Sequence, residues 1–137
     1  MKILFGIVEL ARGLAQRESP RQFTLETIRA TQVATALRAP NAQAFDRGNA
    51  QNLVRFAVTR RHADLECALK FALTHAAALA AAGPVLTFVL EDGPGIAELY
   101  LADAAVRTVR CSPTGLATDT EYEFVGGAIT DSPPGTN

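Results

Sequence analysis

Cysteine and histidine are the most reactive side chains in this sequence, and there are two of each. Cys67 and Cys111 have no CxxC partner, and His62 and His75 match no metal-ligand spacing. Cys67 falls in the first turns of an expected helix, where the helix dipole lowers a thiol pKa, so a Cys67–histidine pair would make a nucleophile. Packing is the simpler interpretation of both cysteines, and the histidines are expected at the start and on the side of that helix.

Two carboxylates form a second candidate site. Glu91 and Asp92 stand beside Gly93-Pro94-Gly95, a run that could hold a metal or supply an acid pair. A hairpin turn with flanking acids is the commoner reason for such a run. The sequence has no GxGxxG, P-loop or GxSxG pattern. We therefore expect no catalytic residue, no metal and no cofactor, and we expect that the protein is not an enzyme.

Basic residues give the last candidate. Arg60, Arg61 and His62 adjoin the start of the expected helix and could contact phosphate. The formal net charge is −1 and the chain has no Trp and two Tyr, so neither charge nor base stacking favours nucleic acid as the main partner. Contact between subunits is the better interpretation. We predict that Arg47, Arg55, Arg60 and Arg61 are subunit-interface residues.

Length and composition indicate one globular domain. The chain has 137 residues, of which 48% are hydrophobic and 20% charged, so it can bury a core and is not a disordered sequence. We expect one domain over residues 1–130 and a flexible or partner-held tail over 131–137. We expect no signal peptide, membrane span or disulfide framework, and synthesis in a cytoplasm.

One helix is the best-defined element. It is predicted over residues 63–82, with Asp64 as the N-cap and with Gly83-Pro84 as the stop. Its apolar stripe is predicted at helical spacing over Leu65, Leu69, Ala72, Ala76 and Leu79. Strands are predicted at 52–60, with Val54, Phe56 and Val58 pointing inward, and at 85–91 and 96–101. The nearly continuous apolar run of 85–91 is typical of a central strand that is buried on both faces.

The N-terminal third gives weaker patterns. Residues 2–10 predict one strand with Ile3, Phe5 and Ile7 on one face, and 11–22 predict an exposed polar loop. Residues 22–39 are open between a helix that begins at Thr24 and an extended arm rich in threonine, and we favour the extended arm. Residues 40–51 predict a loop, with a turn at 46–49. Together, 22–51 form an extended arm and loop.

The C-terminal third predicts strands at 105–111, 118–125 and 128–130 that are joined by short turns. Tyr122 and Phe124 alternate with Glu121 and Glu123, which is the pattern of a half-buried strand. Short connections favour a meander of antiparallel strands. The predicted fold class is α+β, a mainly antiparallel β-sandwich or small barrel with one helix packed on it.

Several segments over roughly residues 45–130 resemble those of a known group of proteins. They are residues 53–60, the helix positions Ala68, Phe71-Ala72 and His75, the run Gly83-Pro84-Val85, residues 101–106, Gly115, Tyr122 and Gly126-Gly127. They are similar to the tail-tube-like β-barrel virion proteins of bacteriophages, a group of tail tube, distal tail and tail-completion proteins. The resemblance implies a sandwich or barrel with one helix on its side and a long N-terminal loop or hairpin.

The same resemblance implies a virion structural role without catalytic residues. Copies of the chain would pair their sheet edges around a ring, and the 22–51 arm would reach a neighbouring subunit. The implied partners are copies of itself in a ring and other virion tail proteins, with no membrane and with DNA only as passing cargo. The implied location is the virion, after synthesis in the host cytoplasm. A small ligand-binding or adaptor domain is the alternative, and an enzyme built on Cys67 or His75 is the third.

Overall fold

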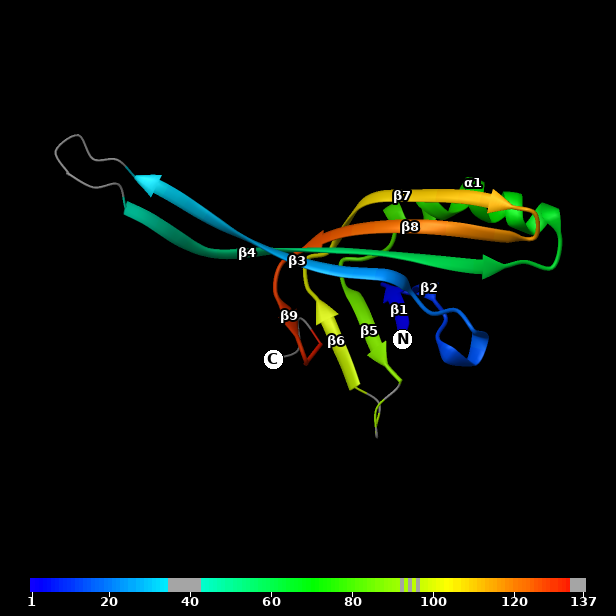
Figure 1. Cartoon of the computed structure of the whole chain (residues 1–137), viewed down its shortest axis with the longest axis horizontal. Helices are drawn as coiled ribbons and strands as arrows, with labels where there is room; N and C mark the ends of the chain where they lie inside the picture. Colours follow the sequence, from blue (N-terminus) through cyan, green and yellow to red (C-terminus); the bar gives the residue numbers. More distant parts are fainter. Residues whose placement is uncertain (35–42, 92, 94, 96, 134–137) are drawn as a thin grey trace.

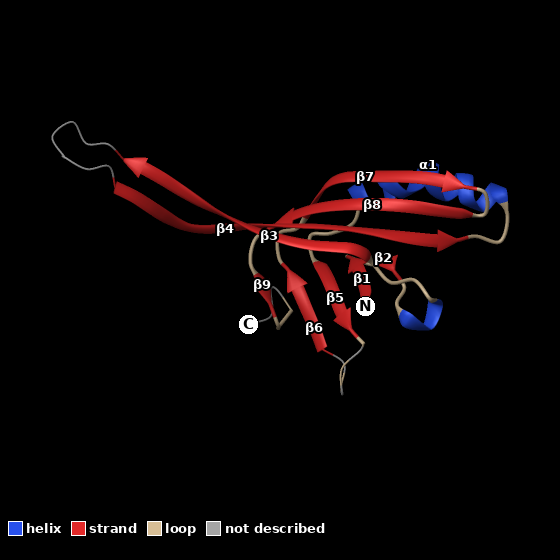
Figure 2. Cartoon of the chain, viewed as in Figure 1, coloured by secondary structure: helices blue, strands red, loops and turns tan. Residues whose placement is uncertain are grey.

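The computed structural model describes residues 1–34, 43–91, 93, 95 and 97–133, which form two antiparallel sheets and one α-helix (Figures 1 and 2). One sheet has the strand order β2-β1-β5-β6-β9 and the other has the order β3-β4-β8-β7. The α+β class and the antiparallel sandwich that the sequence predicts are confirmed. The described strands do not close into a barrel.

The five-stranded sheet contains β1 (Lys2–Phe5), β2 (Val8–Ala11), β5 (Leu86–Leu90), β6 (Ala97–Leu101) and β9 (Ile129–Thr130). The four-stranded sheet contains β3 (Arg21–Ala34), β4 (Gln43–Arg61), β7 (Ala105–Thr114) and β8 (Ala117–Gly126). The helix α1 (Leu65–Ala80) follows β4, and a short 3-10 turn η1 (Leu14–Gln16) precedes β3. The predicted meander is therefore divided, because β5 and β6 lie in one sheet and β7 and β8 in the other.

The ends of α1 agree with the sequence prediction. The Asp64 carboxylate accepts a hydrogen bond from the Cys67 backbone N–H at 2.8 Å, which caps the first turn. After the helix, Gly83 has a φ of 106°, and a Cβ at this position would lie 2.7 Å from the Phe5 ring. Both the left-handed backbone and the close ring require glycine there.

The face that α1 turns to the protein differs from the predicted stripe. Leu65 and Leu69 are exposed, whereas Ala68, His75 and Leu79 are buried against β7 and β8. Apolar residues occur on both sides of this helix, so its spacing alone could not choose the buried face. Small Ala68 lets the backbone approach the sheet closely, and a polar partner on β8 accommodates His75.

The core lies between the two sheets. Val54, Phe56 and Val58 point inward from β4, as predicted, and Tyr122 and Phe124 point inward from β8. The rings of Phe56 and Tyr122 stack with centroids 5.0 Å apart, and the Phe5 and Phe124 centroids are 4.9 Å apart. Aromatic packing therefore joins β1 of one sheet to β4 and β8 of the other.

The strand β5 is central in its sheet, but it is less buried than its apolar sequence predicts. It pairs with β1 on one side and with β6 on the other. Leu86 and Phe88 are buried toward the four-stranded sheet, whereas Thr87 and Val89 are only half-buried on the opposite face. No described element covers that face fully, so the prediction of burial on both sides is wrong.

The predicted single strand over residues 2–10 is two strands that form a hairpin. β1 and β2 pair as neighbours through a turn at Gly6 and Ile7. Gly6 has a φ of 61°, and a Cβ there would lie 2.8 Å from the Gly83 backbone nitrogen. Ile7 is therefore exposed in the turn and does not share the buried face of Ile3 and Phe5.

The described residues of 22–51 form two long antiparallel strands, which we call the arm. The extended interpretation is confirmed over Arg21–Ala34, and the remainder of 22–39 lies outside the described residues. The predicted loop is wrong from Gln43 onward, because pairing with β3 continues to Ala34 opposite Gln43. The predicted turn at 46–49 is a bulge, since Arg29 pairs with Ala50 and Thr31 with Asp46. Figure 1 shows the ends of β3 and β4 projecting beyond all the other strands.

Candidate functional site

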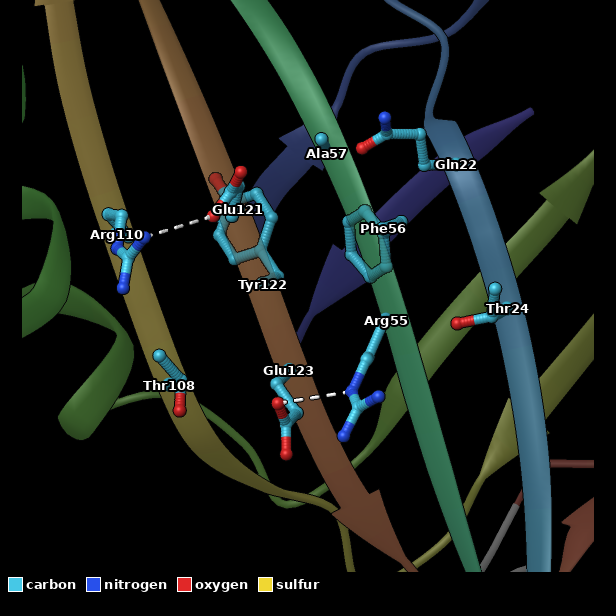
Figure 3. A pocket seen from close by; sticks show the side chains of 10 residues that line it. All are labelled: Gln22, Thr24, Arg55, Phe56, Ala57, Thr108, Arg110, Glu121, Tyr122 and Glu123. Carbon is cyan, nitrogen blue, oxygen red and sulfur yellow. Dashed lines mark hydrogen bonds and ion pairs between the residues drawn. The ribbon is translucent and has the colours of Figure 1, made fainter.

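The outer face of the four-stranded sheet carries a ladder of paired charges. Arg55 Nε lies 3.2 Å from a Glu123 carboxylate oxygen, and Arg107 approaches the same carboxylate at 3.1 Å. Arg110 and Glu121 form a looser pair at 3.8 Å, beside a shallow hollow of about 420 Å³ (Figure 3). These pairs are largely exposed, so each contributes little to stability, and the two carboxylates offset most of the charge of the three arginines.

Neither cysteine is an activated nucleophile. The hydrogen bond and charge of Asp64 raise the pKa of the Cys67 thiol, and burial raises the pKa of the Cys111 thiol. Both effects favour the protonated thiol, which is the reverse of what nucleophilic chemistry needs.

The predicted acidic loop holds the N-terminal segment. Glu91 Oε2 accepts a hydrogen bond from the Leu14 N–H at 3.0 Å and lies 3.9 Å from the Met1 amino group. Asp92 lies outside the described residues. Within the part of the chain that the structure describes, no three His, Cys, Asp or Glu side chains gather as metal ligands.

His75 is a buried hydrogen-bonding residue between α1 and β8. Its Nε2 lies 2.6 Å from the Tyr122 hydroxyl, and its ring stacks on Phe71 with centroids 4.3 Å apart. Burial, with help from the Arg60 charge, lowers the pKa of His75 from 6.5 to about 4, and burial raises the pKa of Tyr122. His75 is therefore neutral at pH 7. Sequence reasoning placed it on the side of a helix and could not identify the partner 47 residues away.

A buried ionic cluster was missed because its carboxylate lies in a polar loop. The Glu18 side chain is 2% exposed and accepts hydrogen bonds from Arg60 Nη2 at 2.7 Å and from Arg12 Nε at 2.9 Å. The Arg60 guanidinium also donates to the Glu9 carbonyl and lies 4.9 Å over the Phe71 ring. This cluster fastens the loop after β2 to β4 and α1.

The structure separates the four arginines that the sequence grouped as interface residues. Arg55 lies on the outer face, and Arg61 is exposed at the end of β4. Arg60 points inward, and its ionic partners leave little of it for another subunit. The side chain of Arg47 lies outside the described residues. Arg61 instead shares a cavity of about 530 Å³ with Arg12 and Arg17, which sequence reasoning treated only as loop residues.

The edge strand β3 carries three exposed apolar side chains among polar ones. It pairs with β4 on one side only. Phe23, Leu25 and Ile28 on this strand are 39%, 50% and 45% exposed, and the Phe23 ring reaches Phe88 of the other sheet at 5.8 Å. Sheet edges in proteins that stay monomeric are usually short, charged or covered. Three exposed apolar side chains on a long edge strand are typical of a surface that meets another chain.

We predict that the free energy of unfolding falls by about 1–2 kcal/mol as the pH drops from 6.5 to 4. Between pH 6.5 and pH 4, His75 is protonated in the unfolded chain but stays neutral in the folded protein, because its pKa is lowered to about 4. Acidification therefore stabilises the unfolded state, and the stability present above pH 6.5 is lost. Burial lowers the pKa of His62 as well, which acts in the same direction. Urea unfolding of the wild type and of His75→Phe at several pH values would measure the difference in slope. Equal slopes for the two proteins would contradict the prediction.

Comparison with solved structures shows a likeness to a chain of a tail particle. No family model and no curated protein matches this chain. A chain from the tail of an empty GTA particle, a helical reconstruction with C6 symmetry, is 13% identical to it. The likeness covers 83% of this chain and 82% of that chain, with a TM-score of 0.38. A search for membrane-spanning helices among the described residues finds none.

Proposed function

We propose that this protein is a non-catalytic virion structural protein of a phage tail, head–tail or baseplate region, and that its copies assemble into a homo-oligomeric ring. The residue resemblance described above supports the virion role. The observation that carries the assembly is the β3 edge, where Phe23, Leu25 and Ile28 are exposed on a strand of 14 residues with one neighbour. Such an edge is stabilised when another strand pairs with it.

The strand order suits closure by rotation. In the order β3-β4-β8-β7 every neighbour is antiparallel, so β3 and β7 at the two edges run in opposite directions. When copies are related by rotation about an axis, β7 of one subunit meets β3 of the next and the alternation continues without a break. The joined sheet then has no free edge. An odd number of strands would have made that junction parallel.

The arm gives a second contact. From Asn52 to Ala57, β4 pairs with both β3 and β8. From Gln43 to Gln51, among the described residues, it pairs with β3 alone. A two-stranded hairpin without a third strand is marginally stable in water. A neighbouring subunit that covers the arm would stabilise it. The paired charges of the outer sheet face offer little to phosphate, so DNA would be only passing cargo.

A small ligand-binding or adaptor domain is the alternative. An apolar cavity of about 160 Å³ opens between the sheets, lined by Met1, Phe23, Leu25, Val54, Phe88, Leu90, Leu99 and Ile129. Sites for small molecules usually enclose about 300–1,000 Å³. This cavity is below that range. An open hollow of about 440 Å³ between the end of α1 and the start of β7, lined by Phe5, Leu79 and Val106 among others, lies within the range and is where the alternative would place a ligand. We favour assembly because the β3 edge is exposed.

We expect the purified protein to form rings, with Ile28→Lys reducing ring formation about tenfold or more, because edge lysines oppose strand pairing. Multi-angle light scattering and negative-stain microscopy would measure the rings. Leu73→Lys is the matched control, since Leu73 is 81% exposed and lies on the helix and not on β3. A strictly monomeric wild type at high concentration would overturn the proposal. Rings that persist in Ile28→Lys would exclude the β3 edge.

A further inference from the structure

A basic corner lies where the loop after β2 meets the end of β4. We define it as Arg12, Arg17 and Arg61, which line the cavity of about 530 Å³. Arg17 is held in a left-handed conformation by its N–H bond to the Leu14 carbonyl. The one carboxylate of the cavity, Glu18, is already taken by Arg12 and the internal Arg60.

The basic corner has more positive charge than its carboxylate balances. Among the described residues, Arg17 and Arg61 make no ion pair, although arginines elsewhere in the fold pair with Glu18, Asp119, Glu121 or Glu123. Two uncompensated guanidinium groups beside an enclosed, polar cavity suit carboxylate or phosphate oxygens.

An acidic corner lies at the opposite edge of the five-stranded sheet. We define it as Asp103, which follows β6, and Asp131, which follows β9. The Ala102 carbonyl accepts from the Gly127 N–H at 2.8 Å, which places Asp103 at one end of β9 and Asp131 at the other. Both aspartates are exposed, and neither forms an ion pair with a described residue.

The strand order keeps the two corners apart within one molecule. β2 is one edge of the five-stranded sheet and β9 is the other, with β1, β5 and β6 between them. Opposite charges on opposite edges are complementary only between two copies that meet head to tail. We infer that the basic corner of one copy binds the acidic corner of a second copy of this chain.

This contact differs from the β3–β7 junction of the proposed ring. Figure 1 shows the strands of the two sheets crossing, so the edges of the five-stranded sheet point along a different direction from β3 and β7. The arm projects on the side of β9, away from β2 and η1. The charged corners would therefore join ring to ring, together with the arm. The inference rests on the proposed function and adds the polarity of stacking to it.

Charge reversal at each corner tests the contact. Arg17→Glu with Arg61→Glu makes both corners acidic, and Asp103→Lys with Asp131→Lys makes both basic. We expect each double variant to keep its rings and to lose stacks of rings about tenfold or more, since like charges then face each other. Negative-stain microscopy and sedimentation velocity at low salt would count the stacks, and thermal melting would confirm folding.

Mixing the two double variants is the decisive experiment. All-acidic rings can alternate with all-basic rings, so a 1:1 mixture is expected to restore the stacks that neither variant forms alone. Asp103→Asn with Asp131→Asn should weaken stacking without this rescue, and Lys70→Glu, a single charge reversal on the helix, should leave stacking unchanged.

The possible failures are distinguishable. Stacks that persist in either reversed variant, or a mixture that does not restore them, would overturn the corner contact while the rings remain. A wild type without rings would overturn the proposed function itself. Loss of duplex DNA binding in Arg17→Glu with Arg61→Glu, without loss of stacking, would assign the basic corner to phosphate and overturn the inference.

Discussion

Replacing Phe124 with alanine is expected to lower the free energy of unfolding by about 3–5 kcal/mol. Phe124 is fully buried, and its ring lies 4.9 Å from Phe5 and 6.2 Å from Phe56, measured between centroids. Removing the ring would leave a cavity where β1, β4 and β8 meet, and the backbone ladders on both sides of β8 prevent its collapse. Urea unfolding followed by circular dichroism would measure the loss.

Leu116→Ala is the control for the Phe124 variant. Leu116 lies in the turn between β7 and β8 and is exposed, so its truncation should change stability by no more than about 0.5 kcal/mol. A Phe124→Ala protein that lost less than about 1 kcal/mol would mean that the two sheets do not share this aromatic core.

Glu18→Ala is expected to cost about 3–5 kcal/mol, because it leaves the mostly buried Arg60 guanidinium without its counter-charge. Two arginines converge on the Glu18 carboxylate, and Arg60 reaches no other carboxylate among the described residues. The loop after β2 would also lose its connection to β4. Denaturant unfolding at low and high salt would measure the effect, and a buried cluster should respond little to salt.

Two matched variants define what Glu18 contributes. Glu18→Gln keeps the volume and part of the hydrogen bonding, so it should lie between the wild type and Glu18→Ala. Glu121→Ala removes a carboxylate of the same type from the exposed pair with Arg110 and should cost about 1 kcal/mol or less. If Glu18→Ala were as mild as Glu121→Ala, the cluster would be a surface feature.

Local signals predicted the elements whose ends or faces they define. Asp64 caps the start of α1, and the helix ends at Ala80, shortly before the predicted stop at Gly83-Pro84. The alternation of Tyr122 and Phe124 with acids defines the faces of β8. These features depend on neighbours within a few residues in the chain, which the sequence displays directly.

Features that depend on distant partners were not predictable. The buried face of α1 depends on the sheet against which it packs. Ala68 and the hydrogen-bonded His75 are buried there, whereas Leu65 and Leu69 are exposed. Glu18 looked like a loop residue because its partner Arg60 lies 42 residues away. The turn-forming residues at 46–49 became a bulge because pairing with β3 outweighed their local preference.

The basic corner was missed for the same reason. Arg12 and Arg17 stood in a polar loop and Arg61 ended a strand, and only the fold brings them to one cavity. The sequence identified Arg61 as a contact residue but grouped it with Arg60, its neighbour in the chain. Successive residues of a strand point to opposite faces, so these two side chains have different surroundings.

The continuity of β4 has a mechanical consequence. One strand runs from the arm through Asn52 into the core, where it pairs with β8 from Asn52 to Arg61. The Asn52 side chain bonds both the Thr27 hydroxyl and the Gly127 carbonyl at this junction. Tension on the arm is therefore directed along β4 and loads its backbone hydrogen bonds in shear, so that many must break together. A particle built from such subunits would transmit pulling forces through its strands, and its turns would carry little of the load.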